Sequence, residues 1–257
     1  MNIMKKKKSR SRSSSEAIAA ARRRILTNEM PFAIKEAYVK LRTNLMFCMT
    51  SDKARPCRSF AITSAKPSEG KSLTASNIAI SFAMLGKKVI LIDADMRKPT
   101  QRRLWEVGAK TGLCDFLAKM SDLHPVKVKE LPLWVLCTGT IPPNPSELLS
   151  SDQMKRFVED CMNTYDYVII DTPPINTVAD AQIVSAYVDG IVLVTKSGET
   201  TTDELNGAID AVHRADGNLC GVVLNDLNMK SVKYSYKYKY EYKYGYRYSY
   251  SNPYETK

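Results

Sequence analysis

Short, continuous apolar runs alternate along this chain with longer stretches of mixed apolar and polar residues. Two of the runs, residues 89–92 and 168–170, contain only valine, isoleucine and leucine. A parallel strand with helices on both faces has this composition, because neither of its faces meets water. The runs and their polar ends predict strands at residues 59–63, 88–93, 133–137, 167–171, 190–195 and 220–224.

Helical periodicity marks the segments between these strands. Before the first strand, Ala33, Ala37, Leu41 and Leu45 recur at four-residue spacing, which favours a helix over residues 31–47. Further helices are predicted at residues 71–85, 146–162, 179–187 and 202–215. Strands that alternate with helices in this way predict a doubly wound α/β domain with a mostly parallel sheet.

Charge divides the chain into three predicted parts: a basic flexible arm at residues 1–28, an α/β domain at 29–228 and a tyrosine-rich tail at 229–257. The formal net charge of the chain is +11. The arm holds nine Lys and Arg against one Glu, and the tail holds seven against two. Basic ends on a nearly neutral domain predict contact with an anionic surface such as anionic lipid, and they argue against nucleic acid as a partner.

Neither an export signal nor a membrane span is expected. The basic start leads into Ser and Arg, and no apolar run approaches the roughly 18–20 residues that a span needs. The six cysteines are scattered and include no C-x-x-C pair. This spacing suggests neither a zinc site nor a disulfide framework, and it predicts reduced thiols in a cytoplasmic protein.

A phosphate-binding motif, AKPSEGKS, spans Ala65 to Ser72. It matches the P-loop pattern except that alanine replaces the first glycine, and it lies between a predicted strand and a predicted helix. Backbone N–H groups and the helix N-terminus surround phosphates in such a loop. Lys71 is then expected to reach the β- and γ-phosphates of ATP, and the Ser72 hydroxyl to bind Mg²⁺. The candidate nucleotide-binding residues are Lys66, Pro67, Ser68, Glu69, Gly70, Lys71, Ser72, Leu73 and Asn225.

Carboxylates follow two of the buried strands. Asp93 and Asp95 come just before Arg97, and Asp171 ends a later strand. The carboxyl ends of parallel strands share one edge of the sheet with the P-loop, so the three carboxylates are expected to meet there. Their mutual repulsion is costly unless a divalent cation lies among them. A single aspartate at a strand end is usually a turn or a helix cap, but three beside a P-loop predict a Mg²⁺ site.

Asn225 ends the last predicted strand. Its amide has one donor side and one acceptor side, which suits the edge of adenine. An Asx turn is the other interpretation, and the sequence leaves both open.

Three motifs together resemble the Walker A, A′ and B motifs of the bacterial tyrosine kinases, or BY-kinases, which are associated with capsule and exopolysaccharide export. These motifs are residues 65–72, residues 93–97 (DADMR) and residues 170–174 (IDTPP). The resemblance runs from about residue 31 to the end and includes residues 139–149, GTIPPNPSELL. It implies a Mg-ATP-dependent protein tyrosine kinase on a P-loop NTPase fold like that of the partition ATPases.

The resemblance also implies a role for each matching residue. Lys71 contacts the phosphates, while Ser72, Asp95 and Asp171 lie at the metal. Asp93 accepts the proton of the tyrosine hydroxyl, which makes Lys71 and the three aspartates the candidate catalytic residues. A standalone form of such a kinase works at the inner face of the cell membrane, with a separate transmembrane activator of the polysaccharide export system as its partner.

Two positions bear on self-association and on the choice of enzyme class. Family members often carry E-x-x-R-x-x-R in the helix before the first strand, where it supports ring-like homo-oligomers. Here Glu36 and Arg42 match, but Val39 occupies the first arginine position. Lys66 occupies the position at which partition-type ATPases carry a lysine that contacts the partner subunit's nucleotide. A partition or septum-positioning ATPase is therefore the alternative enzyme.

Tyrosine occupies every second position in most of the tail. The ten candidate phospho-acceptors are Tyr234, Tyr236, Tyr238, Tyr240, Tyr242, Tyr244, Tyr246, Tyr248, Tyr250 and Tyr254. A strand is one alternative, but residues 234–250 would make it far longer than the usual five or six residues. Stacking on nucleic acid is another. The interleaved Lys, Arg, Ser, Glu and Gly favour a solvated tail that is drawn to an acidic, ATP-loaded site.

The tail favours a kinase over the alternative enzyme, because a partition-type ATPase has no use for ten tyrosines. We therefore predict autophosphorylation of the tail, between chains. A nucleotide-gated scaffold with negligible turnover stays open as a third interpretation, since one pocket can serve both binding and catalysis.

Overall fold

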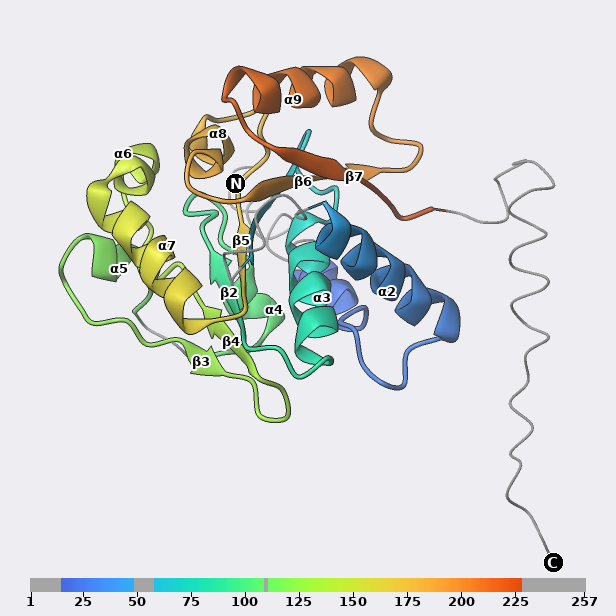
Figure 1. The fold of residues 1–257 in the computed structure, drawn as a ribbon, viewed down its shortest axis with the longest axis horizontal. Coiled ribbons are helices and arrows are strands. Elements are labelled where there is room, and N and C mark those ends of the chain that lie inside the picture. The colour runs from blue at the N-terminus through green and yellow to red at the C-terminus, as the bar shows by residue number, and fades with distance from the viewer. Residues whose placement is uncertain (1–14, 49–57, 109–110, 228–257) are drawn as a thin grey trace, which may run out of the picture. The chain divides into compact units, whose positions relative to one another are not determined.

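A computed structural model describes residues 15–48, 58–108 and 111–227 (Figure 1). Residues up to Asn225 form one unit and the residues after it form a second. The ten candidate tyrosines and residues 1–14 of the arm lie outside the described residues. Their roles therefore stay predictions.

In the described part of the chain, a seven-stranded sheet has the order β3-β4-β2-β5-β1-β6-β7. All neighbouring strands in it are parallel except β3 and β4, which are antiparallel. The strands are β1 (Arg58–Ser64), β2 (Val89–Asp93), β3 (Val126–Lys127), β4 (Leu133–Leu136), β5 (Tyr167–Asp171), β6 (Gly190–Lys196) and β7 (Leu219–Asn225). Every residue of β2 and β5 is buried, as expected for apolar strands at the centre of a covered sheet.

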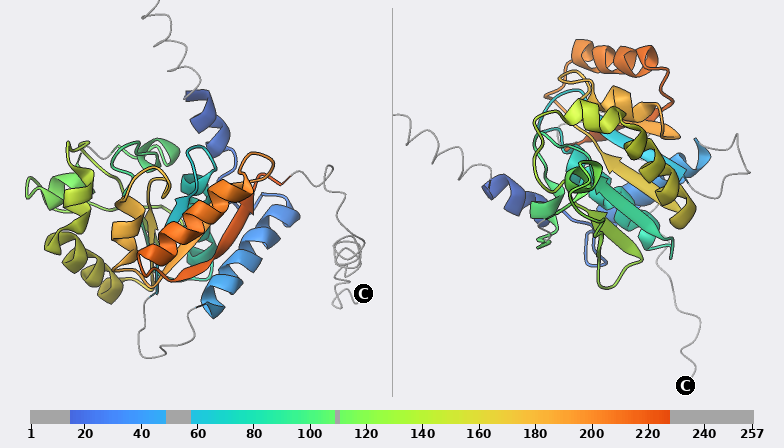
Figure 2. Two further views of the ribbon diagram at one scale, coloured as in Figure 1. Left: turned by 90° about the horizontal axis from the view of Figure 1, so that it is seen from above. Right: turned by 90° about the vertical axis from the view of Figure 1, so that its left-hand side faces the viewer.

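Helices lie on both faces of this sheet (Figures 1 and 2). They are α2 (Phe32–Phe47), α3 (Lys71–Ala83), α4 (Gln101–Leu104), α5 (Leu113–Leu117), α6 (Pro145–Ser150), α7 (Asp152–Thr164), α8 (Asp180–Ser185) and α9 (Thr202–Arg214). Successive residues of a strand point to opposite faces. Phe60 and Ile62 of β1 accordingly pack in a core with α2 and α3, whereas Ala61 packs in a core with α7, α8 and α9. The sheet thus separates two apolar cores.

The predicted fold class is confirmed, and each predicted strand matches an observed one to within one residue at either end. The single helix predicted at residues 146–162 is wrong, because the segment forms two helices, α6 and α7. Ser151 lies between them with an extended backbone, at φ −67° and ψ 149°, and its hydroxyl accepts from the N–H of Met154. A serine in this position caps the helix that follows it.

The N-terminal segment joins the domain before residue 28, where the sequence placed the end of the flexible arm. Residues 15–22 are helical. Leu26 is buried, and its N–H donates to Asn77 Oδ1 at 2.8 Å. Asn77 Nδ2 donates in turn to the carbonyl of Arg24 at 3.0 Å. The end of the predicted arm therefore packs on α3, where its backbone groups and an apolar side chain are both satisfied.

Candidate active site

The candidate site lies at the carboxyl edge of the three central strands. β2, β5 and β1 are neighbours in the sheet, and Asp93 at the end of β2 is the register partner of Asp171 at the end of β5. β1 ends at Ser64, and the P-loop that follows leads into α3 at Lys71. The strand order runs outward from here to β4 on one side and to β6 and β7 on the other. Open α/β sheets bind ligands at such a switch point.

The P-loop takes its shape from two residues with positive φ, Ser68 at 70° and Gly70 at 89°. The positive φ of Gly70 favours glycine, and an added Cβ would also lie 2.1 Å from Asn225 Nδ2, so that side chain would have to move. Gly70 precedes α3, and no side chain of the described residues caps that end of the helix. The first N–H groups of α3 are therefore available to a phosphate. Pro67 and Ser68 are exposed, while Leu73 is half-buried.

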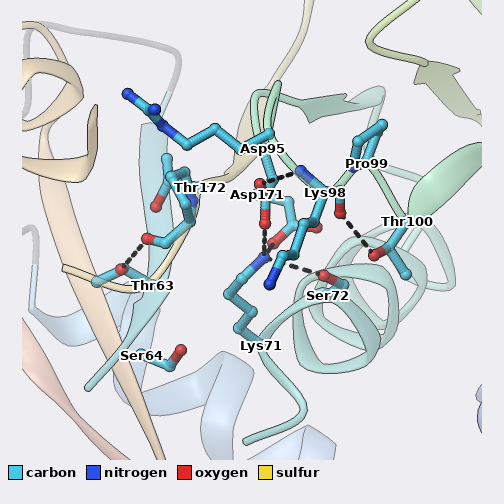
Figure 3. Close-up of polar contacts among 12 residues, drawn as sticks. Thr63, Ser64, Lys71, Ser72, Asp95, Lys98, Pro99, Thr100, Asp171 and Thr172 are labelled. Atoms are coloured by element: carbon cyan, nitrogen blue, oxygen red, sulfur yellow. Dashed lines mark hydrogen bonds and ion pairs between the residues drawn. The ribbon is translucent and has the colours of Figure 1, made fainter. Parts of the chain in front are cut away.

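A buried ammonium group occupies the centre of the site (Figure 3). Lys71 Nζ lies 2.8 Å from Asp95 Oδ2 and 3.2 Å from Asp171 Oδ1. It also lies 3.2 Å from Ser72 Oγ. The exposed fraction of the side chain is 10% for Lys71, 5% for Asp95 and 0% for Asp171. Burial lowers the pKa of Lys71, but the charges of Asp171 and Asp95 outweigh it, so the pKa is raised and the lysine is cationic.

The groups that contact this ammonium are the three that the sequence predicts at Mg²⁺. Ser72, Asp95 and Asp171 thus converge on one cation through oxygen atoms, the ligand type that Mg²⁺ prefers. The donor set fits the metal in its chemistry. Among the described residues, no group of three or more His, Cys, Asp or Glu side chains is arranged to hold a metal ion, so a site here would use two carboxylates and a hydroxyl. The Lys71 ammonium lies between the two carboxylates, and Ser72, Asp95 and Asp171 are the residues that would hold Mg²⁺.

Asp93 is fully buried, and its two oxygen atoms differ. Oδ2 accepts from the backbone N–H of Thr100 at 3.0 Å and of Gln101 at 2.8 Å. Oδ1 is buried and has no hydrogen-bond partner among the described residues. Burial and the charge of Asp171 raise the pKa of Asp93 to about 8. Asp93 thus combines an unpartnered oxygen, among the described residues, with a raised pKa.

Gln101, which the sequence analysis did not single out, joins two of the aspartates. Its backbone N–H binds Asp93, and its side-chain Nε2 donates to Asp171 Oδ2 at 2.9 Å. The whole residue is buried. A lone glutamine after a loop belongs to no motif, so the sequence contains no signal that would have found it.

Asp180 is a second residue that sequence reasoning missed. It is fully buried at the start of α8 and accepts from Arg97 Nε at 2.8 Å and from Arg97 Nη2 at 3.0 Å. Ser146 of α6 donates to the same carboxylate at 2.7 Å. These bonds attach the loop after β2, which carries Asp95, to two helices. They also give a structural role to Ser146, which lies in the 139–149 segment that resembles the kinase family.

Lys66 lies apart from the carboxylate cluster. Its Nζ donates to the carbonyl of Glu199 at 2.6 Å and to Glu204 Oε2 at 2.9 Å. Glu69 is buried, and its carboxylate accepts from the Lys66 N–H at 2.9 Å and from the Thr200 hydroxyl. These contacts attach the P-loop to the loop between β6 and α9. Lys66 is thus paired within its own chain.

Asn225 lies against the P-loop, where its Nδ2 donates to the carbonyl of Glu69 at 2.9 Å. The donor side of the amide is therefore in use. This contact is neither the Asx turn nor the adenine contact that the sequence left open. Binding of adenine by Asn225 stays a prediction.

Helix α2 carries the incomplete E-x-x-R-x-x-R pattern. Arg42 donates from Nη1 to the carbonyl of Ser81 in α3 at 2.7 Å. This arginine therefore attaches α2 to its own domain. The expectation that Val39 disfavours self-association through α2 stays a prediction.

Comparison with known proteins agrees with the P-loop fold and the kinase motifs described above. A family model described as ParA, a NUBPL iron-transfer P-loop NTPase, matches residues 57–248. The tyrosine-protein kinase YwqD of Bacillus subtilis is 44% identical over 204 residues, which cover 78% of this chain and 85% of that protein. The crystal structure of the chimerical protein CapA2B2 matches with a TM-score of 0.75 at 36% identity, over 79% of this chain and 90% of that one. The kinase domain of the Escherichia coli tyrosine kinase ETK matches with a TM-score of 0.71 at 33% identity, over 82% and 86%.

These similarities decide between the two enzyme classes that the sequence left open. The relatives are named for tyrosine kinase activity, and the match covers more than three quarters of the chain. The P-loop, the A′ run and the Walker B strand all lie within the matched region and meet at one edge of the sheet. This chain is therefore a protein tyrosine kinase with a ParA-like P-loop fold, and it belongs to the bacterial tyrosine kinases.

Proposed function

We propose that this kinase transfers the γ-phosphoryl group of Mg-ATP to the tyrosines of its own tail, between chains. The observation that carries the proposal is the cluster of Lys71, Asp95 and Asp171 beside the N-terminus of α3. It combines cation-binding oxygen atoms with a phosphate-binding helix end. The tail supplies ten tyrosines in a segment that carries seven basic and two acidic residues. Such a segment is attracted to an acidic site that holds ATP.

Ser72, Asp95 and Asp171 are the residues that would hold Mg²⁺. Bound Mg²⁺ would neutralise the charge that develops on the phosphates during transfer. Lys71 then leaves the carboxylates and binds the β- and γ-phosphates. It exchanges one set of anionic partners for another, so it stays charged throughout. The first N–H groups of α3 bind the same phosphates and fix their position.

Asp93 receives the proton of the acceptor tyrosine in this proposal. The hydroxyl is protonated at neutral pH, and its oxygen forms a bond to the γ-phosphorus as the bond between that phosphorus and ADP breaks. The proton passes to Asp93 Oδ1, which has no hydrogen-bond partner in the part of the chain that the structure describes. Burial and the charge of Asp171 raise the pKa of Asp93 to about 8, which makes its carboxylate a stronger base than an ordinary aspartate. Oδ2 stays bound to two backbone N–H groups, which keeps the carboxylate oriented.

The proposal extends to the cell, where the kinase would regulate capsular or exopolysaccharide synthesis and export. Its partners would be a second copy of the chain and a separate transmembrane activator, at the cytoplasmic face of the cell membrane. Within the described ranges, no helix is long and apolar enough to cross a membrane. The basic residues of the arm would contribute about 1 kcal/mol each to binding of anionic lipid when close to the surface. Co-sedimentation with anionic liposomes should therefore fall when residues 1–12 are deleted.

The direct test uses protein purified from a host without tyrosine kinases and treated with phosphatase. Incubation with Mg-ATP should produce phosphotyrosine on the full chain, and mass spectrometry should locate it between residues 234 and 254. A chain that lacks residues 229–257 is the control and should stay unmodified. A full chain that binds nucleotide but gains no phosphate would instead support the nucleotide-gated scaffold.

A further inference from the structure

Gln101 uses all of its side-chain hydrogen-bonding capacity inside the protein. Nε2 donates to the carbonyl of Ser72 at 3.0 Å and to Asp171 Oδ2 at 2.9 Å. Oε1 accepts from Ser76 Oγ at 2.8 Å and from Trp105 Nε1 at 3.1 Å. A primary amide has two donor hydrogens and two acceptor positions. No capacity is left, as expected for a polar side chain that is fully buried.

The chemistry of Trp105 fixes the direction of this amide. An indole N–H can only donate, so the Gln101 atom that faces it has to be the oxygen. Nε2 must then face Asp171 and the Ser72 carbonyl, both of which can only accept when Asp171 is ionised. The orientation therefore follows from the partners and does not depend on distinguishing oxygen from nitrogen by position.

Asp171 consequently has two oxygens with different roles. Gln101 binds Oδ2, while Oδ1 faces the Lys71 ammonium. Because glutamine is neutral, it orients the carboxylate without cancelling its charge. A lysine or arginine at position 101 would also orient Asp171, but its charge would compete with a metal cation.

The backbone of the same residue orients a second carboxylate. The Gln101 N–H donates to Asp93 Oδ2 at 2.8 Å, so one residue at the start of α4 contacts the ends of two neighbouring strands and the start of α3. We propose that Gln101 is a positioning residue of this kinase, which holds Asp171 so that Oδ1 stays directed at the cation position beside Ser72. The inference rests on the proposed Mg-ATP site.

The test measures how ADP binding depends on Mg²⁺, by calorimetry, in wild type and in Gln101→Met. Methionine keeps the size of the side chain and removes both amide donors. Partners that orient a metal ligand typically change metal affinity by about 10–100-fold. The Mg²⁺ concentration that gives half-maximal ADP affinity should therefore rise by about 10–100-fold, while ADP affinity at saturating Mg²⁺ stays close to that of wild type.

Two control variants separate positioning from general damage. Gln153→Met makes the same change in α7, where Gln153 donates to the carbonyl of Phe116 at 2.9 Å, and it should leave the Mg²⁺ dependence unchanged. Trp105→Phe removes a bond to Oε1 but keeps both Nε2 donors, so its shift should be smaller than that of Gln101→Met. If Gln101→Met does not fold, Gln101→Asn, which shortens the amide by one methylene, replaces it with the same expected shift.

An unchanged Mg²⁺ dependence in the folded position-101 variant would overturn the positioning role. Failure of the underlying Mg-ATP site is a separate result, visible in wild type alone as equal ADP affinity with Mg²⁺ and with EDTA. The kinase assay adds an independent readout. Loss of positioning at Asp171 should raise the Mg²⁺ requirement of the reaction, and excess Mg²⁺ should restore most of kcat.

Discussion

Two lysines of the P-loop, five residues apart, have opposite environments. Lys66 pairs with Glu204, and the exposed fractions of the two side chains are 33% and 38%. Lys71 pairs with Asp95 and Asp171, and none of these three side chains is more than 10% exposed. Water and salt screen the first pair, but they screen the second far less. The same residue type thus attaches a surface loop in one place and balances the charge of the site in the other.

The buried position of Lys71 helps to explain how three aspartates can share one edge of the sheet. Carboxylates in such proximity repel one another strongly when buried. The Lys71 ammonium lies against two of them, and backbone N–H groups bind one oxygen of the third, Asp93. Lys71 therefore balances much of the negative charge of the cluster.

Replacement of Lys71 by Met should have the largest effect, because it removes the buried ammonium group that pairs with Asp95 and Asp171. Asp95 and Asp171 would lose their cation, and breaking a buried pair costs about 3–5 kcal/mol. Loss of a group that stabilises charge in the transition state costs about 10²–10³ in rate. The variant should form no detectable phosphotyrosine and should unfold at lower urea concentration. Wild-type urea stability would show that the carboxylates do not depend on this ammonium.

Replacement of Asp171 and of Asp93 should separate two roles in the buried cluster, metal binding and proton acceptance. Asp171→Asn weakens a metal ligand, so its rate at low Mg²⁺ should fall by more than the about 10–100-fold that loss of an outer-shell partner costs, and it should recover in part at high Mg²⁺. Asp93→Asn removes the proton acceptor but keeps an oxygen for the N–H groups of Thr100 and Gln101. Its rate should stay low at every Mg²⁺ concentration. Rate against Mg²⁺ is measured for both variants, and equal recovery of the two would refute the division of roles.

Replacement of Lys66 by Ala should have the smallest effect, because it removes only the exposed pair. The hydrogen bonds of the Thr201 N–H and of Lys66 lower the pKa of Glu204, but an exposed ion pair contributes little to stability. Tail phosphorylation and thermal stability should both stay close to wild type, and Glu204→Gln serves as the matched variant. Complete loss of activity in Lys66→Ala alone would mean that Lys66 contacts nucleotide, as in the partition-type ATPases.

The fold could be predicted from the sequence because several local patterns each indicate the same strands and helices. The runs at 89–92 and 168–170 each predict a buried strand on their own, and Ser64 to Lys71 marks the passage from strand to helix. Ser151 shows the limit of this reasoning. Periodicity continues across residues 146–162, but the serine side chain caps a new helix and the chain changes direction there.

Of the candidate site, only the residues that belong to recognisable motifs could be predicted from the sequence. Asp93, Asp95 and Asp171 could be placed together because strand ends share one edge of the sheet. Gln101 and Asp180 could not, since their importance comes from long-range hydrogen bonds that no local pattern records. The pairing of Lys66 with Glu204 is likewise a contact between segments 138 residues apart.

A mixing experiment tests the central claim most directly. Full-length Lys71→Met has an intact tail but no active site, and a wild-type chain without residues 229–257 has an active site but no tail. Neither should become phosphorylated alone. Mixed with Mg-ATP, they should yield phosphotyrosine on the Lys71→Met chain, at a rate that rises with the concentration of the tailless chain. An unmodified Lys71→Met chain in the mixture, under conditions in which the full wild-type chain becomes phosphorylated, would contradict transfer between chains.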